Sequence, residues 1–325
     1  MRKGIKLGLL LCVLLSGREL MAQTDYRVQE ASIANENDVY TFRNQDKYYS
    51  NGLLFHFRFV PESGKWLSPK SNDTKFIVDF ELIHKFFTPQ DVRFDDVDEY
   101  ERPYAGWLNT GVSFSLFPSE SVRWMYGAEL GLVGKASGGE GLQTWYHNAV
   151  GFPKPRGWQY QIPNEPFVNL KAAFDKQFVV APRTFDVVSS TEIKVGTGQT
   201  NAMQRVDFRL GKLFSLNNSA FKNALIGRGR SAFENRAYFF AGYGIQYVLH
   251  DITIQGSLWN DNAPHTEDIV PWVRHLRIGW AASSRNATFK MTYNWLSREV
   301  KNARSQAYIG FELLIRFGPR SSRRQ

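Results

Sequence analysis

Cysteine and long apolar runs are both scarce in this sequence of 325 residues, and each scarcity excludes a class of protein. The single cysteine, Cys12, excludes a disulfide scaffold and a zinc site built on several thiolates. No apolar run approaches the ~20 residues of a membrane-spanning helix, and the mean hydropathy is −0.37, which excludes a helical membrane bundle. Disorder is excluded too, because 15% of the residues are aromatic. The sequence is that of a large ordered protein, polar on average and rich in aromatic residues.

Residues 1–22 have the features of a secretory signal peptide. Basic residues precede a short apolar core at 7–15, and Ala22 is a small residue suited to cleavage. The apolar core is too short to cross ~30 Å of hydrocarbon, which argues against a transmembrane anchor. Cleavage removes Cys12 with four basic residues and one acidic residue, so the net charge falls from +9 to +6. The remaining charge is too small to form a basic surface for nucleic acid. The signal peptide predicts export across the inner membrane.

Apolar residues alternate with small or polar ones through the rest of the chain. In residues 51–60, every second position from Leu53 to Phe59 is large and apolar, with His56 and Arg58 between. Twelve such segments occur, near residues 35–43, 51–60, 75–87, 105–117, 123–134, 165–177, 183–195, 203–215, 237–250, 272–283, 286–297 and 306–317. Their length of about ten residues suits tilted transmembrane strands. The pattern predicts an all-β fold, a twelve-stranded antiparallel transmembrane β-barrel of the outer membrane over residues 23–317.

The last of these segments, residues 307–317, ends in Phe317. It resembles the C-terminal signal of outer-membrane barrels, which makes the barrel assembly machinery an expected partner. A basic tail at residues 318–325 follows, whereas such signals often close the chain. An alternating final strand is also compatible with a soluble sandwich, but the export signal and the even number of strands favour the barrel.

The lengths of the connections predict which side of the membrane each one faces. Short connections near residues 118–122, 178–182 and 284–286 are expected in the periplasm. The connections between strands 1–2, 3–4 and 5–6 then face outward, and the last of these spans roughly residues 135–164. Polar residues with no evident structural role gather in these three connections. They predict a site at the outer rim of one half of the barrel.

No familiar catalytic motif identifies the chemistry of this rim. The sequence contains no Gly-x-Ser-x-Gly, no His-Glu-x-x-His, no P-loop and no Gly-x-Gly-x-x-Gly. Residues 140–150 are, however, expected to form a short helix in an extracellular loop, with Gln143 and His147 on one face. A neutral His147 imidazole could act there as a general base on water or on a hydroxyl. A solvated loop histidine is the plainer interpretation, and both stay open at this point.

Oxygen ligands for a cation lie in the first outward connection. Asp38, beside Asn37, could hold a hard cation, with backbone carbonyls of the turn around Ser50 completing the shell. Such a cation would polarise a carbonyl and stabilise a developing oxyanion, so base and cation together suffice for ester hydrolysis. A polar strand end and an ordinary turn are the structural alternatives.

Five ordered motifs resemble the outer-membrane lipid A 3′-O-deacylase family of Gram-negative bacteria. They are Glu-Asn-Asp at 36–38, Asp-x-Tyr-Tyr-Ser-Asn-Gly at 46–52, Arg-Pro-Tyr-Ala-Gly-Trp at 102–107, Gln-x-x-x-His at 143–147 and Gly-Trp-x-x-Gln-x-x-Asn-Glu-Pro at 157–166. Beyond residue 166 the chain resembles the family only as a generic barrel. In two departures, Glu101 replaces a more usual Asp, and Gly-Lys-Ala-Ser at 134–137 replaces a more usual Gly-Pro.

The resemblance implies a calcium-dependent ester hydrolase acting on lipid A, the anchor of lipopolysaccharide, in the outer leaflet. It implies that His147 is the general base with Gln143 beside it, and that Asp38 is a Ca²⁺ ligand. Asn37 matches a neighbouring active-site asparagine of the family. Ser50 matches a position with a hydroxyl residue, and its role as nucleophile, positioning group or part of the metal shell stays open.

Two rival interpretations belong to other classes of protein. One is a channel or structural barrel that keeps the fold without the activity, although twelve strands leave little lumen once side chains fill it. The other is a phospholipase-like esterase on the same scaffold. The sequence does not predict the oligomeric state.

Overall fold

The computed structural model describes residues 24–41, 47–70, 74–228, 230–231, 234 and 236–320 of the chain. The predicted signal peptide, Asp46 of the second motif and residues 321–325 of the basic tail lie outside these described residues. Within them, no helix combines the length and the apolarity needed to cross a membrane.

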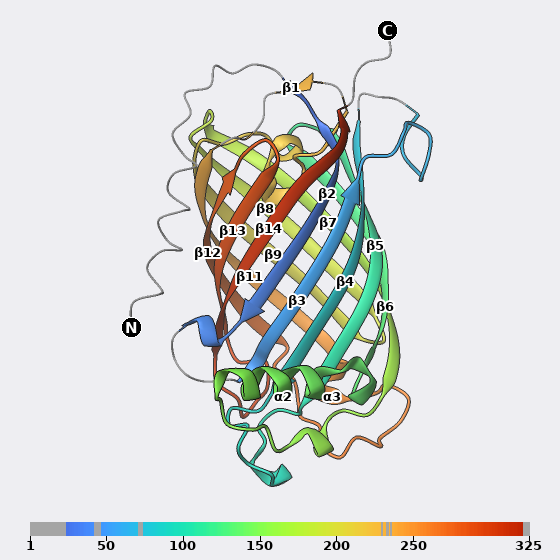
Figure 1. Cartoon of the computed structure of the whole chain (residues 1–325), viewed down its shortest axis with the longest axis vertical. Coiled ribbons are helices and arrows are strands. Elements are labelled where there is room, and N and C mark those ends of the chain that lie inside the picture. The colour runs from blue at the N-terminus through green and yellow to red at the C-terminus, as the bar shows by residue number, and fades with distance from the viewer. Residues whose placement is uncertain are drawn as a thin grey trace.

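Twelve long strands in the described part of the chain form a closed antiparallel barrel, as Figure 1 shows. Each barrel strand pairs with the next along the chain, and the last pairs with the first to close the wall. The strands are β2 (Arg27–Asn37), β3 (Tyr48–Phe59), β4 (Lys75–Thr88), β5 (Ala105–Ser119), β6 (Val122–Val133), β7 (Glu165–Ala181), β8 (Phe185–Gly196), β9 (Gln199–Gly211), β11 (Ala237–Asp251), β12 (Trp272–Ser283), β13 (Ala287–Leu296) and β14 (Gln306–Arg320). The predicted fold class is confirmed.

The alternation in the sequence separates an apolar outer face from a charged lumen. On β6, Leu130 is 61% exposed on the outer face while its neighbour Glu129 is 3% exposed inside the barrel. On β9, Phe208 is half exposed, whereas Asp207 is fully buried. Successive side chains of a strand point to opposite faces, so one sequence period supplies both the lipid-facing wall and the polar interior.

Two of the predicted strands are misplaced along the chain. The first strand was expected at residues 35–43 but is Arg27–Asn37, because Asn37 Oδ1 accepts the Val39 N–H at 2.8 Å and turns the chain out of the sheet. A 3-10 helix, η2 (Val39–Thr41), follows. The strand expected at 203–215 is Gln199–Gly211, because its connection to β8 contains only residues 197–198.

The three short connections and the three long connections that the sequence assigns to opposite sides lie at opposite ends of the barrel. The short turns after β5, β7 and β12 lie at the end where β1 (Thr24–Asp25) and the end of β14 are found, here called the terminal end (Figure 1). The long connections at residues 38–47, 89–104 and 134–164 lie at the opposite end, here called the loop end. Helices α2 (Gly139–Val150) and α3 (Ile252–Gln255) are both at the loop end.

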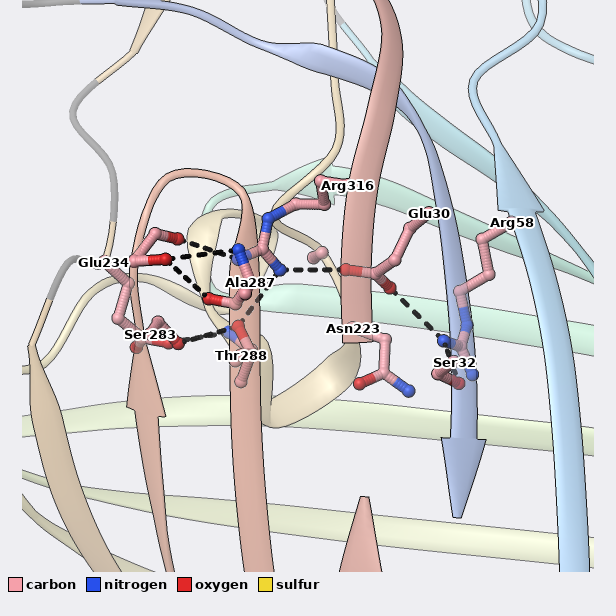
Figure 2. A network of polar contacts seen from close by, with 12 residues as sticks. Glu30, Ser32, Arg58, Asn223, Glu234, Ser283, Ala287, Thr288 and Arg316 are labelled. Atoms are coloured by element: carbon pink, nitrogen blue, oxygen red, sulfur yellow. Dashed lines mark hydrogen bonds and ion pairs between the residues drawn. The ribbon is translucent and has the colours of Figure 1, made fainter. Parts of the chain in front are cut away.

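At the terminal end a long connection packs against side chains of the barrel wall. Residues 212–236 carry η6 (Leu216–Asn218), η7 (Ala220–Lys222) and β10 (Arg230–Ser231), which pairs with β1. Figure 2 shows the adjoining ion network, in which Glu30 lies between Arg58 at 3.2 Å and Arg316 at 3.0 Å. Buried carboxylates are costly unless paired, and here two guanidinium groups satisfy one carboxylate. A cavity of about 350 Å³, with charged residues such as Asp79, Lys171 and Glu312 in its lining, remains deeper in the lumen.

Candidate functional site

Helix α2 confirms the helix expected at residues 140–150. Glycines in the left-handed conformation bound it, with Gly138 at φ 81° before it and Gly151 at φ 80° after it. The Gly151 N–H donates to the His147 carbonyl at 2.9 Å, a C-terminal cap that glycine makes without a steric penalty. The helix packs against β4 and β5, and its buried residues are Gly139, Gln143 and His147. The face predicted to carry the two functional side chains is therefore the face turned to the barrel.

Glycine at two positions allows α2 to approach the wall. A Cβ atom on Gly139 would lie 3.1 Å from both the Gly106 Cα and the Trp158 ring. A Cβ atom on Gly106 would lie 2.0 Å from Ser137 Oγ. The third motif thus supplies Gly106 so that the start of α2 can pack directly on β5.

His147 is 2% exposed, and its ring is oriented by a backbone carbonyl. Its Nδ1 lies 2.5 Å from the Pro153 carbonyl oxygen, which can only accept a hydrogen bond. In the neutral ring the proton is therefore on Nδ1, and Nε2 carries the lone pair. Gln143 is fully buried on the same face, and its Oε1 accepts the Trp158 Nε1–H at 2.8 Å. Gln143 thus ties α2 to the fifth motif.

Asn37 and Asp38 lie where β2 ends, and both are 4% exposed. The Asp38 carboxylate accepts the Lys47 N–H at 2.6 Å through Oδ2. Its carbonyl accepts the Thr41 N–H at 3.0 Å and the Thr41 hydroxyl at 2.8 Å. The connection between β2 and β3 is thereby folded around a buried carboxylate.

Ser50 occupies a β-bulge of β3. The register with β4 shifts between Tyr49, which pairs with Phe87, and Asn51, which pairs with Phe86, so Ser50 has no partner in that ladder. Its Oγ lies 2.7 Å from Thr88 Oγ1, and Ser50 is 1% exposed. Bulges often re-aim a side chain or a carbonyl, and this one does so beside the end of β2.

Strand register brings the first two motifs together, and α2 lies beside them. Asn37 pairs directly with Asn51, so the neighbours Asp38 and Ser50 belong to one corner of the wall. Tyr40 of η2 interacts electrostatically with Tyr146 of α2, which is next to His147. Burial raises the pKa of the Tyr40 phenol, and this interaction raises it further. All five predicted site residues thus lie at the loop end, three on the wall and two on the helix that covers it.

The side chains of Arg102 and Tyr104 in the third motif pack against neighbouring residues and do not face the site. Tyr104 is fully buried, with its ring centroid 5.1 Å from that of Trp158. Arg102 is 2% exposed, donates to Thr253 Oγ1 at 2.9 Å and lies 4.4 Å over the Phe87 ring. The departure at Glu101 is also structural, since its Oε1 accepts the Gln90 N–H at 2.6 Å. Arg102 and its neighbours therefore order the loop between β4 and β5.

Two residues at the site carry no sequence signal. Thr88 contacts Ser50 from β4, and Gln306 Oε1 accepts the Tyr49 N–H at 2.8 Å from β14. Both contributions depend on which strands are neighbours, so periodicity in one segment does not reveal them. Tyr48, which the second motif includes, adopts φ 61°, a left-handed backbone conformation uncommon for a non-glycine residue and often found at functional sites.

Oxygen atoms dominate the groups available to a metal ion. Within the described residues, no three His, Cys, Asp or Glu side chains cluster as a metal site. The corner instead offers one carboxylate (Asp38), one amide (Asn37) and the hydroxyl and carbonyl groups of the Ser50 bulge. Calcium accepts such mixed sets of oxygen ligands, whereas zinc prefers nitrogen and sulfur.

A closed twelve-stranded barrel with an apolar outer face and a polar site at one rim defines an outer-membrane barrel. The chain belongs to the LpxR family: the family model described as "Outer membrane protein LpxR" matches residues 7–317. The family membership predicted from the five motifs is confirmed.

One solved structure supports the fold, and a second shows a weaker similarity. LpxR from Salmonella typhimurium is similar with a TM-score of 0.71 at 19% identity, over 89% of this chain and 100% of that one. The β domain of the Bordetella autotransporter Brka has a TM-score of 0.46 at 11% identity, over 90% of this chain and 99% of that one. No curated protein matches the chain in sequence.

Proposed function

We propose that the protein is an outer-membrane esterase that hydrolyses the 3′-O-linked acyl ester of lipid A. Family membership supports the substrate class, and five motifs resemble the lipid A 3′-O-deacylases. The observation that carries the chemistry is the contact between His147 Nδ1 and the Pro153 carbonyl. It fixes the tautomer in which Nε2 is the basic nitrogen, as a general base requires.

The proposed nucleophile is a water molecule activated by His147. Nε2 removes a proton from the water as its oxygen attacks the acyl carbonyl, and later returns a proton to the departing sugar oxygen. The ester C–O bond breaks, and the products are a fatty acid and a free hydroxyl on lipid A. Ser50 is assigned a positioning role because its hydroxyl is hydrogen-bonded to that of Thr88.

Calcium is the proposed metal because the corner offers oxygen donors. Asp38 would be the charged ligand, and the Ser50 bulge would add its backbone carbonyl. Bound there, the ion would polarise the ester carbonyl and stabilise the oxyanion. Asn37 Oδ1 accepts the Val39 N–H, so Asn37 would act on the oxyanion through its Nδ2–H donors.

The proposed orientation puts the loop end outside the cell. Short turns of outer-membrane barrels face the periplasm and long loops face outward. The short turns and both ends of the described chain share the terminal end (Figure 1). His147 and Asp38 then lie at the level of the outer leaflet, where lipid A resides. The ion pairs and the 212–236 connection that fill the terminal end argue against an open channel.

The test is expression of the full chain in a Gram-negative host, followed by mass spectrometry of lipid A with and without chelator. We expect loss of one acyl chain that requires calcium, and no such loss with His147→Ala. His275→Ala is the matched control, because His275 lies on β12 and bonds to Gln246 Oε1 at 2.9 Å, outside the site. This control should leave deacylation intact.

The other outcomes decide between the rivals. An unchanged lipid A profile, with a folded barrel and calcium present, would overturn the proposal in favour of a non-enzymatic barrel. Loss of an acyl chain from phospholipid instead would identify a phospholipase-like esterase. Deacylation that persists in His147→Ala would remove the assignment of the base while leaving the activity standing.

A further inference from the structure

The wall of the barrel has a gap where β2 ends. The last pairs made by β2 at the loop end are Asn37 with Asn51 of β3 and Asn37 with Ile309 of β14. Residues 48–50 and 306–308 continue beyond these pairs with no strand between them. The two segments approach each other across the gap, since the rings of Tyr49 and Tyr308 are 4.7 Å apart.

The side chain of Gln306 bridges this gap. Its backbone belongs to the β13–β14 ladder, where it pairs with Leu296, while its side chain reaches β3. Its Oε1 accepts the Tyr49 N–H at 2.8 Å in a buried hydrogen bond, and Gln306 is 5% exposed. The connection between β13 and β14 supplies the Arg304 N–H, which donates to the Tyr48 hydroxyl at 2.9 Å. The Tyr49 N–H and the Tyr48 hydroxyl are thus held from β14 and from the connection that precedes it.

Glu299 orients the Gln306 amide. The Gln306 Nε2–H donates to Glu299 Oε2, which leaves Oε1 directed at Tyr49. An amide has an acceptor and a donor end, so fixing the donor end fixes the acceptor end as well. The Gln306 amide therefore cannot rotate freely, and it fixes the position of the Tyr49 N–H.

We propose that Gln306, oriented by Glu299, is a positioning residue that sets the geometry of the Ser50 bulge and thereby the affinity of the site for calcium. The calcium part of this inference rests on the proposed function. Replacing a residue that hydrogen-bonds to a metal ligand, without binding the metal itself, typically lowers metal affinity by about 10–100-fold. The Gln306 side chain bonds to the Tyr49 N–H and to Glu299, so its proposed effect passes through the Tyr49–Ser50 backbone.

The experiment compares calcium binding and backbone exchange in the purified full chain in detergent micelles. Calcium is titrated calorimetrically without substrate, and hydrogen–deuterium exchange of a peptide covering residues 48–50 is measured without calcium. We expect Gln306→Ala to weaken calcium binding by about 10-fold or more and to speed exchange of this peptide. The combined change Gln306→Glu with Glu299→Gln keeps both lengths and reverses the hydrogen bond between them. It should recover much of the affinity that either single change loses.

Gln177 provides a matched control at the terminal end. It is also 5% exposed, its Oε1 accepts the Leu216 N–H at 3.1 Å, and its Nε2–H donates to Asp186 at 2.6 Å. Gln177→Ala removes the same kind of bridge, so it should lower barrel stability comparably. Calcium affinity and exchange at residues 48–50 should not change in this variant.

Each result decides the inference. If Gln306→Ala binds calcium as tightly as the wild type, or if Gln177→Ala weakens binding equally, the positioning role is overturned. If the wild type binds no calcium, the proposal of a calcium site is rejected. The exchange data then test separately whether the Gln306 bridge holds residues 48–50. Faster exchange at residues 48–50 in Gln306→Ala alone would then support it, and unchanged exchange would overturn it.

Discussion

Replacing Glu234 by glutamine should make the barrel more stable above neutral pH. Glu234 lies in the 212–236 connection at the terminal end and is fully buried. It accepts the Ser219 hydroxyl and the Ala220 N–H, each at 2.7 Å. Burial raises the pKa of its carboxyl from 4.5 to about 7, although these hydrogen bonds and the Arg209 charge oppose the shift. A glutamine side chain at this position is uncharged at every pH, and its amide oxygen can still accept from Ala220.

The magnitude follows from the difference in pKa between the folded and unfolded chains. Between pH 4.5 and 7 the folded chain keeps a proton on Glu234 that the unfolded chain has lost. The stability contributed by this group is therefore complete below pH 4.5 and is lost as the pH rises through 7. The total loss is roughly 3 kcal/mol, because one unit of pKa corresponds to about 1.4 kcal/mol.

Urea unfolding in detergent micelles, followed by tryptophan fluorescence at pH 5 and pH 8, measures this contribution. At pH 8 the free energy of unfolding of Glu234→Gln should exceed that of the wild type by up to roughly 3 kcal/mol. At pH 5 the two free energies should differ little. The control is Glu312→Gln, which leaves Lys290, its partner at 3.0 Å, without a counter-charge and should be destabilising at pH 8. A Glu234→Gln barrel no more stable than the wild type at pH 8 would refute the reasoning.

Two further predictions concern the ion network and Ser50. Glu30→Ala leaves Arg58 and Arg316 buried without their shared carboxylate and should lower the free energy of unfolding by roughly 3–5 kcal/mol, measured in the same assay. A change below about 1 kcal/mol would show that water compensates. Ser50→Ala should reduce deacylation by about tenfold or less if Ser50 only positions the bulge. A loss above roughly 10⁴-fold, measured as turnover on lipid A in micelles, would instead make Ser50 the nucleophile.

The barrel and the helix were predictable because each depends on a local pattern. Alternation over about ten residues requires only that one face meets lipid and the other meets the lumen. Leu130 and Glu129 illustrate it, since adjacent residues differ in exposure from 61% to 3%. The spacing of Gln143 and His147 likewise places both on one face of α2 with no knowledge of what that face contacts.

The end of β2 and the bulge at Ser50 were not predictable in the same way. Residues 27–34 contain few large apolar side chains, so the alternation there is weak, while residues 39–41 have high strand propensity but form η2. A side-chain hydrogen bond from Asn37 decides where the strand ends. A bulge is a property of two strands in register, so Ser50 has no individual signature. Its partner Thr88 has none either, nor has Gln306, which bonds to Tyr49.

The early end of β2 explains why the site lies where it does. In a closed barrel wall the backbone groups of each strand bond to neighbouring strands, so an intact wall offers few polar groups to a ligand. Beyond Asn37 the wall lacks a strand between β14 and β3, and backbone groups there need other partners. Gln306 satisfies the Tyr49 N–H, and the chain leaving β2 brings in the Asp38 carboxylate. One strand that ends early therefore creates a polar corner at the loop end, at the opposite end of the barrel from the ion network of Glu30.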